Sequence, residues 1–351
     1  MIFPIDPERI MRMPVKTVVH ALSSWNPGSA NEFYSEADYW WKNPQDPQGA
    51  YICRDGMSNP ECFNRHRKLV LRMSCQVAGL TSAYLEDNNP QYLQTVNHIL
   101  HAWFIDSNTA MRPHLNYAQA IRNKCSGRCF GVIDTIHWAE TALSIKKLAD
   151  VLPEYTVQQC KKWFADFLEW LCTSKLGSTE RSTTNNHSVC WYMQAAAYAS
   201  LTGNEKLLAE FRNDFKNILL QQIAPDGSCP LELERTKPYG YSLFVLEAFT
   251  GLAAILSTSQ ENFFTVKGDC GQNVAKAMEY IVPFIADKSL WQLPPDVLYD
   301  EYWPCRMSSL CLSGHFLQKS EYQKLYEQLP FPAAVFEVLR NFPIRHPRLW
   351  M

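Results

Sequence analysis

The sequence predicts an all-α protein, an incomplete (α/α) toroid made of antiparallel helical hairpins. From about Lys68 onward, apolar residues recur at spacings of three and four, which is typical of helices with one buried face. Strand-type alternation is almost absent, and the short connectors are rich in Asn, Pro, Gly and Ser. About eight helices joined by short turns form hairpins, which can stack side by side and close into a ring around a cleft. We therefore expect a single toroid domain over residues 1–351.

The expected helices follow one another along the chain with short breaks. The first has its apolar residues between Leu69 and Tyr84, and the second between Tyr92 and Trp103. The turn cluster Asp-Asn-Asn-Pro90 separates them. Further segments with a helical period lie at 132–151, 156–174, 189–202, 205–221, 242–257, 272–287 and 307–328.

Residues 30–65 precede these helices and differ from them in composition. They include the aromatic run Tyr34-Ser-Glu-Ala-Asp-Tyr-Trp-Trp41 and then a stretch rich in Pro, Gly and Asn. A long loop inside a compact domain is usually functional or disordered, and the density of aromatic side chains argues against disorder. We interpret residues 30–65 as a lid.

The composition excludes several classes of protein. With 46% hydrophobic and 19% charged residues it is that of an ordinary globular protein, and no uninterrupted run of about 18 apolar residues predicts a membrane-spanning helix. The net charge of −2 provides no bulk positive field, so we expect neither a nucleic-acid nor a membrane partner. Aromatic residues make up 13% of the chain, which suits a cleft where sugars stack on rings as well as a Trp-rich core.

The N-terminus carries no recognisable export signal. Pro4, Asp6, Pro7 and Glu8 stand where a signal peptide would have its apolar region. This fits a cytoplasmic protein, or a periplasmic or secreted one whose signal was trimmed. The sequence leaves the compartment and the oligomeric state open.

The first polar cluster is Ser182-Thr-Thr-Asn-Asn-His-Ser188, directly before the apolar run that starts at Val189. Ser, Thr and Asn side chains accept hydrogen bonds from the N–H groups at a helix N-terminus, so capping is one interpretation of Asn185 and Asn186. The neighbouring His187 favours a second interpretation, a site that binds a ligand. An imidazole beside a carboxamide at the positive end of a helix dipole can hold an anion and move a proton.

The second polar cluster is Glu232-Leu-Glu-Arg-Thr-Lys-Pro-Tyr-Gly-Tyr-Ser242, again before an apolar segment. Pro238 and Gly240 prevent a helix from running through it, which leaves Arg235 in a loop and Tyr241 near the next helix start. A surface loop with packing tyrosines is the alternative interpretation. If the two helices point the same way, the polar clusters at their N-terminal ends converge.

A third group of polar side chains lies within residues 111–134 and suits the hydroxyl groups of sugars. It comprises His114, Asn116, Tyr117, Gln119 and the cation Arg128. Each of them alone can equally be a cap or a polar residue of the core.

The sequence lacks the motifs of several common types of catalytic site. The chain has no GxGxxG, P-loop, GxSxG or HExxH motif, so dinucleotide, phosphoryl-transfer, serine-hydrolase and zincin chemistry have no starting point. Its twelve cysteines include no CxxC pair, which argues against a zinc site and a disulfide scaffold. We expect no metal and no cofactor.

Together these motifs resemble those of the alginate-lyase-type polysaccharide lyases. The resemblance covers about residues 30–310 and rests on the aromatic run at 34–41, Asp55-Gly56, His66-Arg67, Asn116-Tyr-Ala-Gln, Asn185-Asn-His187, Arg235-Thr-Lys-Pro and Tyr241-Ser-Leu-Phe. It implies an incomplete (α/α) toroid, no obligatory metal, and cleavage of a polyuronate by β-elimination. Some members of the group act on alginate and others on glucuronan-like chains.

The resemblance also implies which residues form the site. Four are expected to be catalytic: Asn186, His187, Arg235 and Tyr241. An anionic polysaccharide is the expected partner, and the expected substrate contacts are Tyr34, Trp40, Trp41, His66, Arg67, His114, Asn116, Tyr117, Gln119, Asn185 and Tyr239. Tyr239 is also the alternative to Tyr241 in its catalytic role.

The chemistry of the reaction suggests a role for each catalytic residue. The proton on C5 of a 4-linked uronate is very weakly acidic, so the neighbouring carboxylate must be neutralised, for which Asn186 and Arg235 are suited. A base takes this proton and an acid protonates the departing O4, leaving a 4,5-unsaturated uronate at the new non-reducing end. In mannuronate both atoms lie on one face, and Tyr241 could serve as base and acid. In guluronate they lie on opposite faces, with His187 as the base and Tyr241 as the acid.

Two other functions stay open at this stage. A glycoside hydrolase on a helical toroid, acting on sugars that contain uronic acid, would need a pair of carboxylates that the sequence does not place. A catalytically silent sugar-binding toroid is the other alternative.

Overall fold

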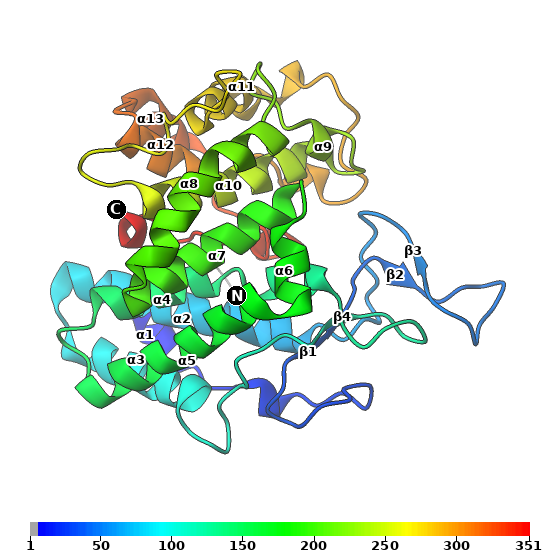
Figure 1. Cartoon of the computed structure of the whole chain (residues 1–351), viewed down its shortest axis with the longest axis vertical. Helices are drawn as coiled ribbons and strands as arrows, with labels where there is room; N and C mark the ends of the chain where they lie inside the picture. The colour runs from blue at the N-terminus through cyan, green and yellow to red at the C-terminus, as the bar shows by residue number, and fades with distance from the viewer. Residues whose placement is uncertain (1–5) are drawn as a thin grey trace. The chain divides into compact units, whose positions relative to one another are not determined.

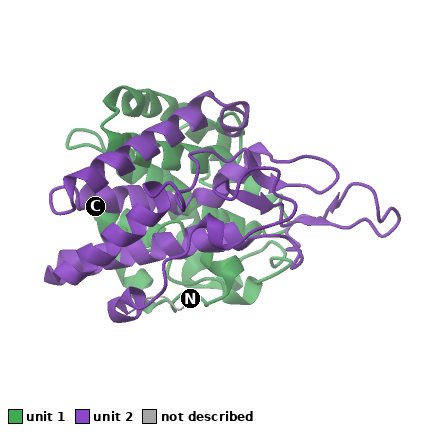
Figure 2. Ribbon diagram, turned by 90° about the horizontal axis from the view of Figure 1, so that it is seen from below, with its two compact units in different colours: residues 1–4, 181–351 green, residues 5–180 purple. Residues whose placement is uncertain are grey.

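The computed structural model describes residues 6–351, which form helices and two small pairs of strands (Figure 1). They divide into two compact units (Figure 2): residues 6–180 belong to unit 2, and Arg181–Met351 form unit 1. Helices dominate the described part of both units, as the sequence predicts.

Unit 2 contains the first six α-helices: α1 (Pro7–Met11), α2 (Arg65–Asp87), α3 (Pro90–Phe104), α4 (Trp138–Lys147), α5 (Glu154–Thr173) and α6 (Lys175–Arg181), which ends at the unit boundary, with the 3-10 helices η1 (Val18–His20) and η2 (Cys129–Thr135). The predicted turn between α2 and α3 is confirmed. Asn88 ends α2 in the left-handed conformation, and the Asn89 side chain caps α3. Aromatic rings of α3, α4 and α5 fill the core, with Trp138 in edge contact with Trp103 and Trp163.

The segment predicted as a lid contributes three short strands, and a fourth comes from later in unit 2. β1 (Tyr34–Glu36) is parallel to β4 (Tyr117–Ala120), and β2 (Trp40–Trp41) is antiparallel to β3 (Ile52–Cys53). Residues 33–38 are buried, so this part of the predicted lid belongs to the core of unit 2. The β2–β3 hairpin extends away from the helices of the unit (Figures 1 and 2). A lid role for the hairpin stays a prediction.

Unit 1 contains α7 (Asn186–Thr202), α8 (Glu205–Gln222), α9 (Pro230–Leu233), α10 (Pro238–Leu256), α11 (Val274–Ala286), α12 (Ser308–Phe316), α13 (Ser320–Gln328) and α14 (Phe336–Leu339), with the 3-10 helices η3 (Lys288–Leu290), η4 (Asp300–Tyr302) and η5 (Pro347–Trp350). α7 and α10 pack against each other most extensively and are buried along most of their length. Among the described helices, α10 alone is long and apolar enough to cross a membrane, but 89% of its apolar window is buried in the protein, as is typical of a core helix.

The structure corrects three predicted helices. Within 132–151, the first residues belong to η2, and the α-helix starts only at Trp138. The segment 307–328 is two helices, because Gln318 between them has a φ of 57°. α10 starts at Pro238, earlier than the apolar period indicates, since proline is well suited to the first helical position.

Candidate active site

The N-terminal end of α7 carries Asn185, Asn186 and His187. Asn185 is the N-cap residue, and its side-chain oxygen accepts a hydrogen bond from the His187 N–H at 3.2 Å. The capping interpretation is therefore confirmed for Asn185. Asn186 is buried, whereas His187 is half-buried and reaches the surface of unit 1.

Asn186 is bound to Glu232 by two hydrogen bonds. Its main-chain N–H donates to Glu232 Oε1 at 2.8 Å, and its side-chain Nδ2 donates to Oε2 at 2.7 Å. Both residues are 2% exposed. Glu232 stands on the short helix α9, so it joins the first polar cluster to the second. The sequence offers one signal for this role, the position of Glu232 within one turn of Arg235.

Burial and neighbouring groups act in opposite directions on the pKa of the Glu232 carboxyl. Burial raises the pKa of its carboxyl, and the hydrogen bonds from Asn186, together with the nearby Arg235 and His187, act in the opposite direction. The amide, the guanidinium and the imidazole therefore lie around one buried carboxylate within unit 1.

Arg235 and Tyr241 form the second contact of the site. Arg235 Nη2 donates to the Tyr241 hydroxyl at 3.3 Å, and the guanidinium carbon lies 4.4 Å from the centroid of the Tyr241 ring. Both side chains are half-buried. Tyr241 is in the first turn of α10, where its N–H donates to the Lys237 carbonyl at 2.9 Å. A guanidinium in this position stabilises negative charge on the phenol oxygen.

Tyr239 points into the core, which corrects its predicted substrate role. Its side chain has no exposed surface, its hydroxyl donates to the Phe284 carbonyl at 3.0 Å, and its ring packs edge-on against Trp291. Burial raises the pKa of its phenol. The structure thus separates the two tyrosines: Tyr239 packs, and Tyr241 reaches the surface.

In unit 2, His66 is a core residue rather than a substrate contact. It is 1% exposed, its Nδ1 accepts the N–H of Tyr34 at 2.9 Å, and its Nε2 lies 2.6 Å from the Ala21 carbonyl. Because a main-chain N–H can only donate, Nδ1 carries no proton, and Nε2 donates to Ala21. Burial lowers the pKa of His66 to about 4, so the ring is neutral.

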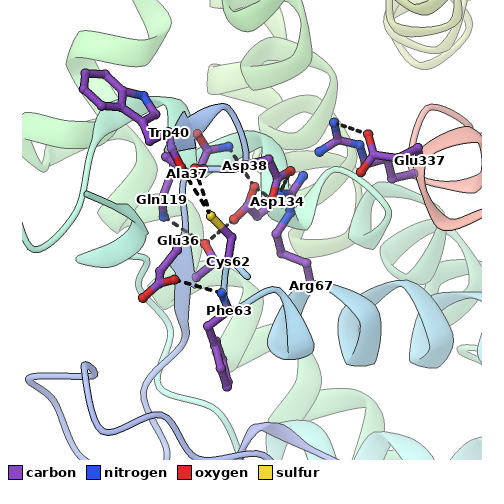
Figure 3. Close-up of polar contacts among 12 residues, drawn as sticks. Glu36, Ala37, Asp38, Trp40, Cys62, Phe63, Arg67, Gln119, Asp134 and Glu337 are labelled. Atoms are coloured by element: carbon purple, nitrogen blue, oxygen red, sulfur yellow. Dashed lines mark hydrogen bonds and ion pairs between the residues drawn. The ribbon is translucent and has the colours of Figure 1, made fainter. Parts of the chain in front are cut away.

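Arg67 is also turned inward. It forms ion pairs with Asp38 and, at 3.0 Å, with Asp134, and all three side chains are almost fully buried (Figure 3). Burial raises the pKa of the Asp134 carboxyl, while Arg67 lowers it. Both carboxylates already bind this guanidinium, so the structure assigns Arg67 to the interior of unit 2.

Tyr34 is likewise buried, with 2% of its surface exposed. Its hydroxyl donates to Glu36 Oε1 at 3.1 Å, and Arg122 binds both oxygens of Glu36 at 2.8 and 2.9 Å. A substrate contact was expected for Tyr34, whereas its side chain lies in the core of unit 2.

The tryptophans of the hairpin are half-buried and lie beside cations. Lys124 Nζ lies 4.3 Å and the Arg128 guanidinium carbon 5.7 Å from the centroid of the Trp40 ring. The Arg54 guanidinium carbon lies 5.2 Å from the centroid of Trp41. Rings flanked by cations suit a saccharide that carries carboxylates.

The remaining predicted contacts lie in and beside β4. Gln119 has a φ of 51°, in the left-handed region. Its side chain accepts from Arg128 at 2.8 Å and donates to Asp134 at 3.0 Å. His114, Asn116 and Tyr117 are at least partly exposed; His114 pairs with Glu32 at 3.1 Å, and Asn116 accepts from Trp170 at 3.0 Å.

Comparison with known proteins agrees with this fold. The family model "Alginate lyase" matches residues 22–291, more than half of the chain. A crystal structure of an alginate lyase from Bacteroides ovatus is 28% identical, with 96% of this chain and 89% of that chain covered and a TM-score of 0.82. No curated protein matches the chain.

More distant solved structures share the fold. Alginate lyase A1-III from Sphingomonas species A1 is 14% identical, with 91% of this chain and 84% of that chain covered and a TM-score of 0.53. A variant of alginate lyase A1-III complexed with tetrasaccharide is 15% identical, with the same coverage and a TM-score of 0.58. The predicted fold class, the all-α toroid of alginate lyases, is confirmed by these likenesses. The chain belongs to the alginate lyase family and is a polysaccharide lyase.

Proposed function

We propose that the protein cleaves a 4-linked polyuronate by β-elimination at the N-terminal ends of α7 and α10. The observation that carries this proposal is the Arg235–Tyr241 contact, which places a guanidinium on a phenol at 3.3 Å beside a segment that bears an amide and an imidazole. These four groups are what the elimination requires: two to neutralise a carboxylate, and two to move protons.

Asn186 and Arg235 neutralise the carboxylate of the uronate. Asn186 Nδ2 has two hydrogens, and only one of them is needed for the bond to Glu232 Oε2. Glu232 thus fixes the amide with its nitrogen inward and leaves the second hydrogen for the substrate. Because Asn186 is buried, its bond to a carboxylate would be made in a low-dielectric environment, where such a bond is stronger.

His187 and Tyr241 move the protons. The C5–H bond breaks, its electron pair forms the C4=C5 double bond, and the C4–O4 bond breaks as O4 takes a proton. Arg235 stabilises the phenolate form of Tyr241 before or after this transfer. For a mannuronate or a glucuronate, whose C5 proton and O4 lie on one face, Tyr241 does both transfers. For a guluronate, His187 takes the C5 proton and Tyr241 protonates O4.

Several residues of unit 2 are proposed as substrate contacts. Trp40 and Trp41 offer ring faces beside cations, and Gln119 holds a strained backbone conformation of the kind that gathers at binding sites. His114, Asn116 and Tyr117 lie near it in the sequence and present polar atoms. The tetrasaccharide bound to alginate lyase A1-III supports a saccharide substrate.

A glycoside hydrolase would need one carboxylic acid and one carboxylate facing the bond that is cleaved. The two buried carboxylates next to the polar clusters of unit 1 do not offer this pair. Glu232 binds Asn186 with both oxygens, and Asp296 binds the N–H groups of Tyr239 and Gly240 with both of its own.

The proposal is tested by incubating the protein with mannuronate-rich and guluronate-rich alginate, glucuronan and glycosaminoglycans. The unsaturated uronate absorbs in the ultraviolet, and a hydrolase or a silent binding protein would give no such signal. Tyr241→Phe and His187→Ala are expected to lose turnover while unfolding as the wild type does. Tyr280→Phe, which changes a tyrosine of α11, is the control and should stay active. Absorbance from no substrate, or wild-type rates in Tyr241→Phe, would refute the proposal.

A further inference from the structure

The start of α10 carries Tyr241, but the residues there provide no cap. The N-cap residue, Lys237, has no side-chain acceptor, and it makes no capping hydrogen bond. Pro238 has no N–H, so the first groups that need acceptors are the N–H groups of Tyr239 and Gly240.

Asp296 supplies the missing cap from a distant part of the sequence. Its Oδ1 accepts the Tyr239 N–H at 3.0 Å, and its Oδ2 accepts the Gly240 N–H at 2.9 Å. The side chain is 6% exposed. A carboxylate placed here satisfies both donors and interacts favourably with the positive end of the helix dipole.

We propose that Asp296 is a positioning residue for the elimination, which fixes the start of α10 and thereby the direction in which Tyr241 presents its phenol. This inference rests on the proposed function. Tyr241 directly follows Gly240, so a change in the first turn moves the phenol at the end of a long side chain. Displacements of about 1 Å at a reacting group can cost about a hundredfold in rate.

The loop that carries Asp296 is itself held in place. Val297 N–H donates to the Thr236 carbonyl at 3.1 Å, and Asp296 N–H donates to Asp300 Oδ1 at 3.1 Å. Asp300 is paired with Lys288 at 2.8 Å. Hydrogen bonds from the segment around Asp296 therefore hold the chain on both sides of Lys237, at Thr236 and at Tyr239 and Gly240.

The absence of a side chain at Gly240 leaves room for the Asp296 carboxylate. A Cβ atom at Gly240 would lie 2.6 Å from Asp296 Oδ2, closer than real Cβ contacts. A larger residue would therefore displace the carboxylate. Asp296 lies beyond residues 22–291, which the family model matches, so the family match does not include it.

The ionisation of Asp296 gives the proposal a second readout. Burial raises its pKa to about 6, with Asp300 acting in the same direction, and the two N–H donors and Lys237 acting against it. The Tyr239 side chain is uncharged, and Lys288, whose Nζ lies 4.9 Å from the centroid of the Tyr239 ring, is paired with Asp300. Protonation below about pH 6 weakens the cap.

The test compares Asp296→Asn and Asp296→Ala with Asp287→Asn. Asp287 caps the Ser289 N–H near the start of the same loop and makes no hydrogen bond to the polar cluster. We expect kcat to fall about tenfold in Asp296→Asn and about a hundredfold in Asp296→Ala, with KM within about threefold, and Asp287→Asn to match the wild type. The ratio of wild-type to Asp296→Asn kcat should shrink as the pH falls through about 6.

A double-mutant cycle with Gly240→Ala tests the contact itself. Gly240→Ala should lower kcat in the wild type but add little in Asp296→Ala, because the carboxylate that it displaces is already gone. Unchanged kcat in folded Asp296→Asn and Gly240→Ala, or additive losses in the cycle, would overturn the proposal. If Asp296→Ala does not fold, Asp296→Asn replaces it in the cycle.

Amide hydrogen exchange separates this proposal from the proposed function. Exchange at Tyr239 and Gly240 should speed up in the Asp296 variants and stay slow in Asp287→Asn, whether or not the protein turns over a polyuronate. A wild type without product absorbance counts against the proposed function. Unchanged exchange in the Asp296 variants counts against the positioning role.

Discussion

Glu232 and Asp296 hold the side chains of unit 1 that we propose to be reactive, although we assign no chemistry to either of them. Glu232 orients the Asn186 amide, and Asp296 caps the helix that carries Tyr241. Both carboxylates are buried and have both oxygens in hydrogen bonds, so each residue is an acceptor at a fixed place. Removing either acceptor leaves buried donors without partners, which is costly.

Glu232→Gln is expected to lower kcat about ten- to hundredfold. The glutamine can accept the Asn186 main-chain N–H, but its own NH₂ then faces the Asn186 side-chain NH₂, so the amide must turn or move. Stability should fall by about 1–3 kcal/mol. Steady-state kinetics and urea unfolding measure both effects. Glu234→Gln, an exposed carboxylate of the same segment, is the control, and equal kinetics in the two variants would exclude the orienting role of Glu232.

His66 is expected to make unit 2 sensitive to acid. Burial lowers its folded-state pKa to about 4, below the ordinary value of 6.5, so its contribution is fully present above pH 6.5 and is lost as the pH falls through about 4. The loss is at most about 3 kcal/mol. The free energy of unfolding should therefore decline over this range, and less steeply in His66→Asn. The exposed His101→Asn is the control, and identical slopes in all three proteins would contradict the prediction.

At the scale of elements, several helices are capped by the side chain of their own N-cap residue. Asn89, Asn185, Asn204 and Asn273 cap α3, α7, α8 and α11 with their own side chains. α10 differs, because its cap comes from Asp296 far along the chain. Local caps are visible in the sequence, whereas a distant cap needs the tertiary fold.

Arg67 joins α2, η2 and the segment after β1 in unit 2, and Arg67→Met tests how much these ion pairs contribute to stability. Arg67 on α2 pairs with Asp38 after β1 and with Asp134 in η2. Without the cation, two buried carboxylates face each other, at a cost of about 3–5 kcal/mol near neutral pH. The cost should shrink in acid, because protonation removes the two charges.

Urea unfolding of Arg67→Met at neutral and acidic pH measures this difference. Arg54→Met, which removes an exposed guanidinium beside Trp41, is the control and should change stability by no more than about 0.5 kcal/mol. A loss in Arg67→Met that is the same at both pH values would rule out a charge effect.

At the scale of the whole molecule, the net charge of −2 offers no general attraction for an anionic polymer. Attraction must come from local cations such as Arg235, Lys124 and Arg128. The Debye length falls from about 30 Å at 0.01 M to about 8 Å at 0.15 M salt, so KM for a polyuronate should rise several-fold over this range while kcat changes little. Initial rates at matched viscosity measure this, and a KM independent of salt would argue against binding by cations.

Much of the proposed site was predictable from the sequence because it is local. The polar clusters at 182–188 and 232–242 stand at the starts of two helices, and the Asn185 cap and Pro238 mark where α7 and α10 begin. The expected substrate contacts differ from the structure where the tertiary fold buries a side chain. His66 and Tyr34 suit a binding cleft by residue type, but both are in the core of unit 2.

The sequence by itself determined that the chain is helical, where most helices lie, and which two segments carry an amide, an imidazole, a guanidinium and a phenol. Helical periods and caps depend on neighbours within a few residues, so they can be seen in one chain. Only the tertiary structure decided that Glu232 binds Asn186, that Asp296 caps α10, and that Arg67 turns inward. These contacts join residues 29 to 67 positions apart, and no local pattern encodes them, because they form only when distant segments are packed together.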